Sequence, residues 1–188
     1  MTEIVELHAR AVEAFGARVR SIEDGQWHEP TPCSDWDVRA LVNHLVGESL
    51  WTAPLFEGKT IAEVGDRFDG DVLGSDPAAA WDASEGPALA ALRGEGAMDR
   101  IVHLSFGDVP GSVYAWQLFF DYLIHGWDLA RAIGAVERLD PELVQAAAEW
   151  FATQEELYRQ GGVIAERPDV PDGVDAQTRL LAMAGRTA

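Results

Sequence analysis

The segment FFDYLIHGWDLARA, residues 119–132, constrains the fold of this chain more than any other stretch. On a helix, which advances by about 100° per residue, its apolar side chains cover both broad sides. Only one narrow line is polar, and it consists of Asp121, His125 and Asp128 at the spacing i, i+4 and i+7, so that the three side chains lie along one stripe. This stripe is either the solvent-facing edge of the helix or a line of polar groups in the interior, and periodicity alone favours neither.

The remaining sequence is dominated by further segments with helical periodicity. The clearest helix starts are a capping-box pattern at Ser34 and Asp37, and Asp-Pro pairs at 76–77 and 140–141. Gly86 and Pro87 are expected to bend or interrupt the helix in which they lie. The predicted helices cover residues 3–22, 34–50, 76–93, 114–133 and 140–160, with shorter helices from Thr60 and from about Asp175.

Residues 98–105 alternate in the manner of a strand, and GDVPG, residues 107–111, provides turn chemistry before SVYAW. These segments predict a small β-hairpin. Together with the short connections between the long helices, the pattern predicts an all-α fold, namely an antiparallel four-helix bundle with short extra helices and this hairpin. The expected organisation is a single domain over residues 1–188, with an extended, proline-containing tail from about residue 162.

Charge and cysteine content narrow the class of function. The chain has 32 acidic against 14 basic residues and a formal net charge of -18, which disfavours binding to nucleic-acid phosphates or to anionic lipid. Cys33 is the only cysteine, so that an intramolecular disulfide is impossible, and no window approaches the roughly 20 apolar residues of a membrane span. We therefore expect a soluble, cytoplasmic protein that acts on a small molecule.

Asp121 and His125 could bind one metal ion from a single helix, because rigid helices hold carboxylates and imidazoles at fixed distances. A single pair does not make a tight site. His44, in LVNHLVG, is the best third candidate, although its place on the helix also fits a histidine at the edge of the apolar face. His8 and His103 are weaker candidates. The chain has no glycine-rich phosphate loop, no GxSxG elbow and no CxxC pair.

Two stretches carry a resemblance to a known family. TPCSDWDVRALVNHLVGE, residues 31–48, and FFDYLIHGWDLARAIG, residues 119–134, resemble the two signature segments of the mycothiol-dependent maleylpyruvate isomerase N-terminal family, within the DinB-like superfamily of metal-binding helical bundles. The ending VPDGVDAQTRLLAMAGR resembles that of a short actinobacterial subgroup. The resemblance implies a DinB-like bundle in which His44, Asp121 and His125 bind one divalent metal ion.

The resemblance also carries two differences. The isomerases usually have Glu at the position of Asp121, so that the acidic oxygen of this chain lies one methylene closer to its helix, and ligation through water is an alternative to direct ligation. The full isomerases have an additional C-terminal domain that contributes to their site, and a sequence ending at Ala188 is too short to include it. Maleylpyruvate isomerisation itself is therefore not expected of this chain.

Two histidines and one carboxylate would leave open positions on the ion, as in catalytic rather than structural sites. The expected cofactor is Zn, with Ni and Fe as alternatives, and the expected co-substrate is a thiol such as mycothiol that reacts with a small electrophile. Asp128, Arg131, Arg39 and Trp36 are candidates to orient these ligands, although Trp36 also fits a packing role and the arginines a solvated one. The alternatives are a metal-dependent hydrolase and a non-catalytic metal or small-molecule binding protein, for instance a homodimer through exposed bundle faces.

Overall fold

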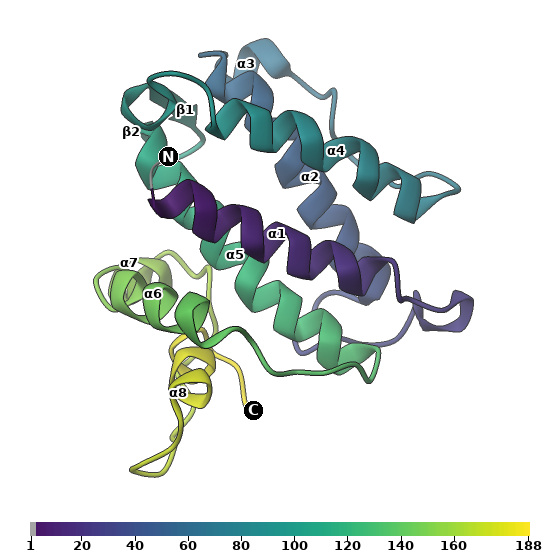
Figure 1. The fold of residues 1–188 in the computed structure, drawn as a ribbon, viewed down its shortest axis with the longest axis vertical. Coiled ribbons are helices and arrows are strands. Elements are labelled where there is room, and N and C mark those ends of the chain that lie inside the picture. The colour runs from purple at the N-terminus through teal and green to yellow at the C-terminus, as the bar shows by residue number, and fades with distance from the viewer. Residues whose placement is uncertain (1–2) are drawn as a thin grey trace. The chain divides into compact units, whose positions relative to one another are not determined.

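The computed structural model describes residues 3–188 and divides the chain into two compact units, the first ending at Ala135 and the second covering Val136–Ala188 (Figure 1). The expected organisation as a single domain over residues 1–188 is not decided by this division and stays a prediction. The expected all-α architecture with one small hairpin is confirmed. Within the described residues, no helix is long and apolar enough to cross a membrane.

Four long helices form the first unit. They are α1 (Glu3–Val19), α2 (Val38–Phe56), α4 (Pro77–Leu92) and α5 (Gly111–Ala132). α1 contacts α4 and α5, and α2 contacts the same two helices, so that the four close into a ring. The largest fully buried side chains on these helices include Phe15, Leu41, Leu45, Trp81, Phe119, Tyr122 and Trp127. Because α5 has two helical neighbours in the ring, it needs apolar side chains on two sides, which is the pattern that its sequence shows.

α2 and α5 run in opposite directions along their contact. His44, in the first half of α2, lies against Asp121 of α5. Phe56, at the end of α2, packs against Tyr114 near the start of α5, with the ring centroids 6.0 Å apart. The two segments that carry the family resemblance, residues 31–48 and 119–134, therefore lie side by side where His44 meets Asp121.

α2 begins at Val38, so the predicted start at Ser34 is wrong. Asp37 caps the helix instead, since its carboxylate accepts a backbone N–H of the first turn at 2.8 Å. The residues before it form a separate turn, in which the Trp36 N–H donates to the Cys33 carbonyl at 2.9 Å. Side-chain and turn bonds of this kind compete with helical bonds, and here they delay the helix by one turn.

α4 begins as predicted, with an aspartate as N-cap and Pro77 in the first position. It then continues through Gly86 and Pro87, so the predicted interruption does not occur. A proline within a helix removes one backbone hydrogen bond. The buried side chains of Trp81 and Leu92, on either side of that position, hold α4 in the bundle in spite of this loss.

The hairpin consists of β1 (Ile101–Leu104) and β2 (Gly107–Pro110), which pair antiparallel around a turn at residues 105 and 106. The segment predicted as the turn is therefore the second strand. Val109, a β-branched residue, lies opposite the fully buried Val102, and such cross-strand pairs stabilise a sheet. α5 begins directly after the hairpin at Gly111, three residues before its predicted start.

Short helical segments complete the first unit, namely η1 (Asp24–Gln26), α3 (Ile61–Val64) and η2 (Ala97–Asp99). α3 has the predicted capping box, in which the side chains of Thr60 and Glu63 each bond to the backbone of the other. It ends at Gly65, whose φ of 66° is a conformation that glycine adopts without strain. The helix is therefore shorter than the sequence pattern predicts.

The second unit contains α6 (Pro141–Phe151), α7 (Glu155–Gln160) and α8 (Ala176–Met183), and α6 packs against α8. The predicted single helix over residues 140–160 is thus divided in two. At the break, the hydroxyl and the backbone N–H of Thr153 both bond to the Trp150 carbonyl, at 2.8 and 3.1 Å, and this local bonding replaces the helical pattern. α8 begins after Asp175, as predicted, because Asp175 accepts the Thr178 N–H.

Candidate metal centre

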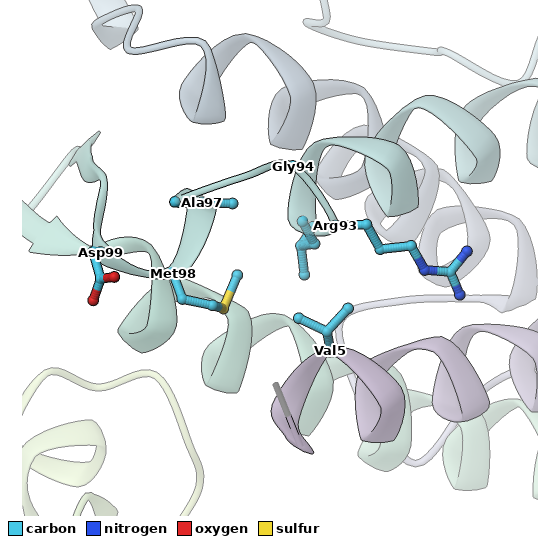
Figure 2. A pocket seen from close by; sticks show the side chains of 8 residues that line it. Val5, Arg93, Gly94, Ala97, Met98 and Asp99 are labelled. Carbon is cyan, nitrogen blue, oxygen red and sulfur yellow. The ribbon is translucent and has the colours of Figure 1, made fainter. Parts of the chain in front are cut away.

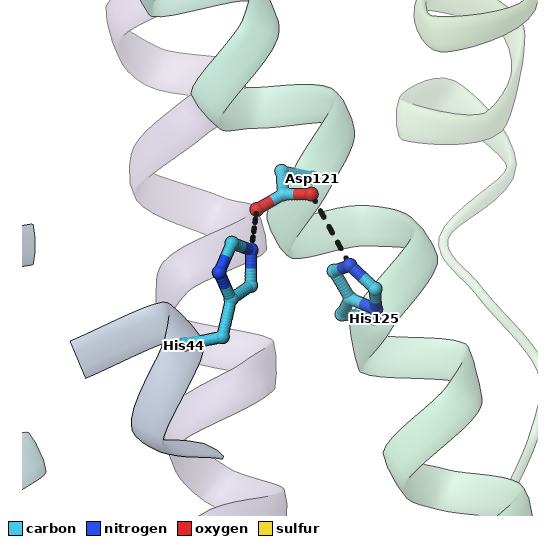
Figure 3. Close-up of side chains that lie close together, drawn as sticks. All are labelled: His44, Asp121 and His125. Carbon is cyan, nitrogen blue, oxygen red and sulfur yellow. Dashed lines mark hydrogen bonds and ion pairs between the residues drawn. The ribbon is translucent and has the colours of Figure 1, made fainter. Parts of the chain in front are cut away.

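Three side chains from α2 and α5 converge (Figure 3). His44 comes from α2, and Asp121 and His125 come from α5, where a spacing of four residues places them one turn apart on the same face. One ligand atom of each residue lies within 4.8 Å of the ligand atoms of the other two. The structure thus brings together the three residues that the sequence pattern and the resemblance propose as metal ligands.

Asp121 lies between the two histidines. Its Oδ2 is 2.9 Å from Nε2 of His44, and its Oδ1 is 3.3 Å from Nε2 of His125 (Figure 3). The short side chain of Asp121 therefore reaches both imidazoles without the additional methylene of a Glu. All three groups present a potential ligand atom to one common space.

The second nitrogen of His125 also has a partner. Nδ1 is 2.9 Å from Oδ2 of Asp128, which lies one turn further along α5. Because an ionised carboxylate only accepts hydrogen bonds, Nδ1 carries a proton and Nε2 is the atom that faces Asp121. Asp128 is fully buried and His125 is 7% exposed. His125 and Asp128 of the polar stripe therefore lie in the interior, whereas Asp121, whose side chain is 32% exposed, lies at the edge of the interior.

The charges of the three groups stabilise one another. Burial raises the pKa of Asp121, but the adjacent His125 and His44 outweigh burial and hold this pKa far below its usual range. Burial lowers the pKa of His125, yet Asp121 and Asp128 raise it to about 9. Burial also lowers the pKa of His44, and the charge and hydrogen bond of Asp121 raise it above the ordinary value. A metal ion that binds here must displace protons from the imidazoles.

Glu48 extends the cluster along α2, although the sequence pattern did not single it out. It lies four residues after His44 and is mostly buried, and the hydroxyl of Tyr114 on α5 donates to its Oε2 at 3.4 Å. Burial raises the pKa of Glu48, and the negative charge of Asp121 raises it further. The segment HLVGE contains the relevant signal, because an acidic residue four positions after a histidine shares its helix face.

An aromatic ring covers the two histidines. The ring centroid of Trp36 is 4.6 Å from that of His44 and 5.3 Å from that of His125. The turn that carries Trp36 is held by Thr31, whose hydroxyl donates to the Trp36 carbonyl at 2.8 Å and accepts the Cys33 N–H at 3.1 Å. Trp36 thus adds a partly exposed apolar surface directly beside the candidate ligands.

The two arginines proposed to orient ligands make their contacts elsewhere. Arg39 bonds to Asp71 and to the Gly74 carbonyl, each at 2.8 Å. The guanidinium of Arg131 lies over the ring of Trp127, 5.1 Å from its centroid. Their participation in ligand binding stays a prediction.

The remaining histidines lie outside the cluster. His28 pairs with Asp37 at 3.1 Å, and His103 pairs with Asp108 across the hairpin at 2.7 Å. His8 is 1% exposed, and neither of its ring nitrogens has a hydrogen-bond partner among the described residues. The sequence pattern gives His8 only as a weaker ligand candidate, and its burial without a polar partner is a finding of the structure.

A separate pocket lies where the end of α4, η2 and the start of α1 meet (Figure 2). Val5, Arg93, Met98 and Asp99 are among the side chains that line it. Its lining contains one carboxylate and neither a histidine nor a cysteine, so that it offers a metal ion a single protein ligand of these types. The contact between α2 and α5 remains the stronger candidate for chemistry.

Comparisons with known proteins support the resemblance seen in the sequence. The sequence profile described as mycothiol maleylpyruvate isomerase N-terminal domain matches residues 8–130, a segment that includes His44, Asp121 and His125. Two uncharacterized proteins of Mycobacterium tuberculosis, from the strains CDC 1551 / Oshkosh and ATCC 25618 / H37Rv, are each 32% identical over 186 residues, which is 96% of this chain and 96% of each relative. No solved structure matches the chain significantly.

Proposed function

This chain belongs to the mycothiol maleylpyruvate isomerase N-terminal domain family, and on that premise we propose that it is a metal-dependent enzyme that uses a low-molecular-weight thiol to transform a small electrophile. Mycothiol is the first candidate for the thiol, and the reaction is a transfer or an isomerisation. The observation that carries the proposal is the convergence of His44, Asp121 and His125, whose ligand atoms lie within 4.8 Å of one another.

The donor set fits a divalent transition metal. Two imidazole nitrogens and one carboxylate oxygen suit Zn, Ni and Fe, and Zn is our first choice. The bond from His125 to Asp128 supports this assignment, because metal-binding histidines commonly donate their other N–H to a carboxylate. When bound, such an ion favours the thiolate form of a thiol at neutral pH.

The residues of the chain would orient the reactants. Asp128 keeps His125 in one tautomer, and Asp121 holds both imidazoles at hydrogen-bond distance or close to it. A reactant would therefore meet groups that are already in place, which lowers the entropic cost of the reaction. Trp36 would bind the organic part of a reactant, since its partly exposed ring lies against both histidines and offers a flat surface for packing.

Metal content tests the first half of this proposal. Protein purified without a tag should contain about one divalent ion per chain, and His125→Ala should lose most of it. His103→Ala is the matched control, because His103 also pairs with an aspartate but lies in the hairpin, and this variant should retain the metal. A native protein that contains no metal and binds none on addition would show that the proposal is wrong.

Incubation with mycothiol and model electrophiles tests the second half. Metal-loaded protein should form thiol conjugates or isomerised products that chromatography and mass spectrometry detect, and His125→Ala should form neither. Cleavage of model esters or amides without conjugates would favour a metal-dependent hydrolase. Metal binding without any of these reactions would favour a non-catalytic binding protein.

A further inference from the structure

Glu48 is a charged group at the candidate centre to which the proposed ligand set gives no role. It is not among the three side chains whose ligand atoms converge. Glu48 nevertheless lies four residues after His44 on the same face of α2, so that its carboxyl group is within electrostatic reach of the cluster. The hydroxyl of Tyr114 donates to it from the facing helix at 3.4 Å, which orients the carboxyl group at the contact of α2 and α5.

The acidic groups of the cluster already balance the charge of a divalent ion. With both imidazoles neutral, as metal binding requires, Asp121 and Glu48 supply two negative charges against the two positive charges of the ion. Asp128 adds a third negative charge behind His125. An anionic electrophile that entered beside the thiolate would therefore add to an excess of negative charge.

The cations that could compensate this charge are engaged in other contacts. Arg39 bonds to Asp71, and Arg131 lies over the ring of Trp127. Recognition of a carboxylate usually requires an arginine fork or a comparable donor set beside it. The surface beside the two histidines is instead the aromatic ring of Trp36.

We propose that Glu48 makes this site selective against negative charge beyond that of the bound thiolate, so that the electrophile it takes is a neutral molecule and not a carboxylate such as maleylpyruvate. The inference rests on the proposed function, because it concerns ligands of the same metal site. A like charge close to a partly buried site weakens the binding of an anion by about tenfold or more. Glu48 is in this sense a specificity-determining residue.

The experiment uses the full-length protein loaded with Co²⁺, because the visible spectrum of Co²⁺ reports ligand binding without turnover. Acetate is the anionic probe and imidazole is the neutral one, each titrated at about pH 8, well above the ordinary pKa of a carboxyl group. In Glu48→Gln, acetate should bind about tenfold more tightly than in the wild type. Imidazole should bind equally well to both proteins.

Two further variants serve as controls. Glu48→Asp retains the charge and should keep the weak acetate binding of the wild type. Glu57→Gln removes the same charge just past the end of the same helix, where Glu57 is exposed and pairs with Lys59, and it should change neither affinity. Equal acetate affinity in the wild type and Glu48→Gln would overturn the inference and leave the proposed function intact. A wild type that binds no Co²⁺ would overturn both.

A measurement on the wild type alone decides the question if Glu48→Gln does not fold. 2-Mercaptoethanol and 2-mercaptoethanesulfonate present the same thiol, but only the second carries a remote negative charge. After correction for the thiolate fraction of each compound, the neutral thiol should bind the Co²⁺ protein about tenfold more tightly. Equal or tighter binding of the sulfonate would show that the site does not discriminate against negative charge.

Discussion

Two buried histidines of the first unit, His8 on α1 and His125 on α5, occupy opposite chemical states. They are 1% and 7% exposed, respectively, and burial lowers the pKa of both. Two carboxylates beside His125 raise its pKa to about 9, whereas burial and the positive charge of Arg93 bring the pKa of His8 to about 3. Both imidazoles are buried to a similar degree. The presence or absence of carboxylate partners therefore decides whether such an imidazole is charged and oriented or neutral.

Among the described residues, only packing contacts hold His8. Its ring stands edge-on to that of Tyr122, with the centroids 5.4 Å apart. The hydroxyl of Tyr122 bonds to Ser49 at 2.6 Å and to the Leu45 carbonyl at 2.9 Å, so it is engaged on α2. Within residues 3–188, His8 thus acts as an aromatic side chain that carries two unpaired nitrogens, and protonation of the second nitrogen would place an unpaired charge in the core.

The largest expected effect that follows from this difference is a loss of folding stability in acid. The pKa of His8 is about 3 in the folded protein against an ordinary value of 6.5, so the unfolded chain binds the proton first as the pH falls. The corresponding stability is fully present above the ordinary value and is lost progressively toward the folded-state pKa, by up to about 5 kcal/mol. Urea unfolding at a series of pH values from about 7 to about 4 measures this loss.

His8→Phe should remove this part of the pH dependence, because it keeps an aromatic ring against Tyr122 and cannot be protonated. At neutral pH its free energy of unfolding should equal or exceed that of the wild type, since two unpaired polar atoms are removed. A variant that loses stability in acid as steeply as the wild type would show that His8 does not carry the effect.

The next largest effect is expected on metal affinity when Asp128, the carboxylate partner of His125, is changed. In Asp128→Asn the amide has no negative charge and can present its own N–H to Nδ1, so that His125 loses its fixed tautomer. Metal affinity should fall by about 10-fold to 100-fold, as measured by competition with a chelator. Asp108→Asn changes the partner of His103 in the same way and should leave the affinity unchanged. Full affinity in Asp128→Asn would mean that the carboxylate partner does not matter for metal binding.

A smaller effect on metal affinity is expected when the pH is varied in the wild type. His125 is protonated below its pKa of about 9 in the metal-free protein, and a protonated imidazole cannot bind a metal. Affinity should therefore fall by up to about tenfold for each pH unit below that value for this one proton, and His44, whose pKa is also raised, adds to the slope. Calorimetry in buffers of different ionisation enthalpy counts the released protons.

His8→Phe provides the control for this measurement, because His8 is neutral at these pH values. It should release the same number of protons as the wild type when metal binds. Metal affinity that does not change between about pH 6 and pH 9 would contradict the assignment of His125 as a ligand.

The smallest effect is expected for Asp121→Glu. The oxygens of Asp121 already lie 2.9 and 3.3 Å from the two imidazole nitrogens, and one methylene more can be accommodated by a change of rotamer. Metal affinity should change by less than about tenfold, in contrast to Asp121→Asn, which removes the charge. A loss of binding in Asp121→Glu as large as in Asp121→Asn would show that the length of this side chain is critical.

The features that the sequence predicts correctly depend on local geometry. Asp76, Asp140 and Asp175 cap their helices as expected, because a cap needs only its own first turn. The pairing of Asp121 with His125 follows in the same way from a spacing of four residues. The addition of His44 depended on the resemblance between two distant segments and the known family.

The features that the sequence did not predict depend on contacts between distant segments. The sequence pattern predicts a turn where the second strand of the hairpin lies, because only the partner strand shows that Val109 belongs to a sheet. On a helical wheel His8 lies between Phe15 and Val19 on the apolar face of α1, but the lack of partners for its nitrogens among the described residues depends on the packing around α1. Glu48 shares a face with His44 in the sequence, but its role at the site depends on Tyr114 and Asp121 from α5.

The position of Asp121 between two imidazoles has a consequence for the way in which metal enters. Where both histidines are protonated, two protons leave when one divalent ion binds. The net charge of the three side chains together with the bound protons or metal ion therefore stays the same. Loading is then an electrically neutral exchange, on which ionic strength has little influence and acidity has a large one. Metal ions and protons would therefore compete for the same three side chains.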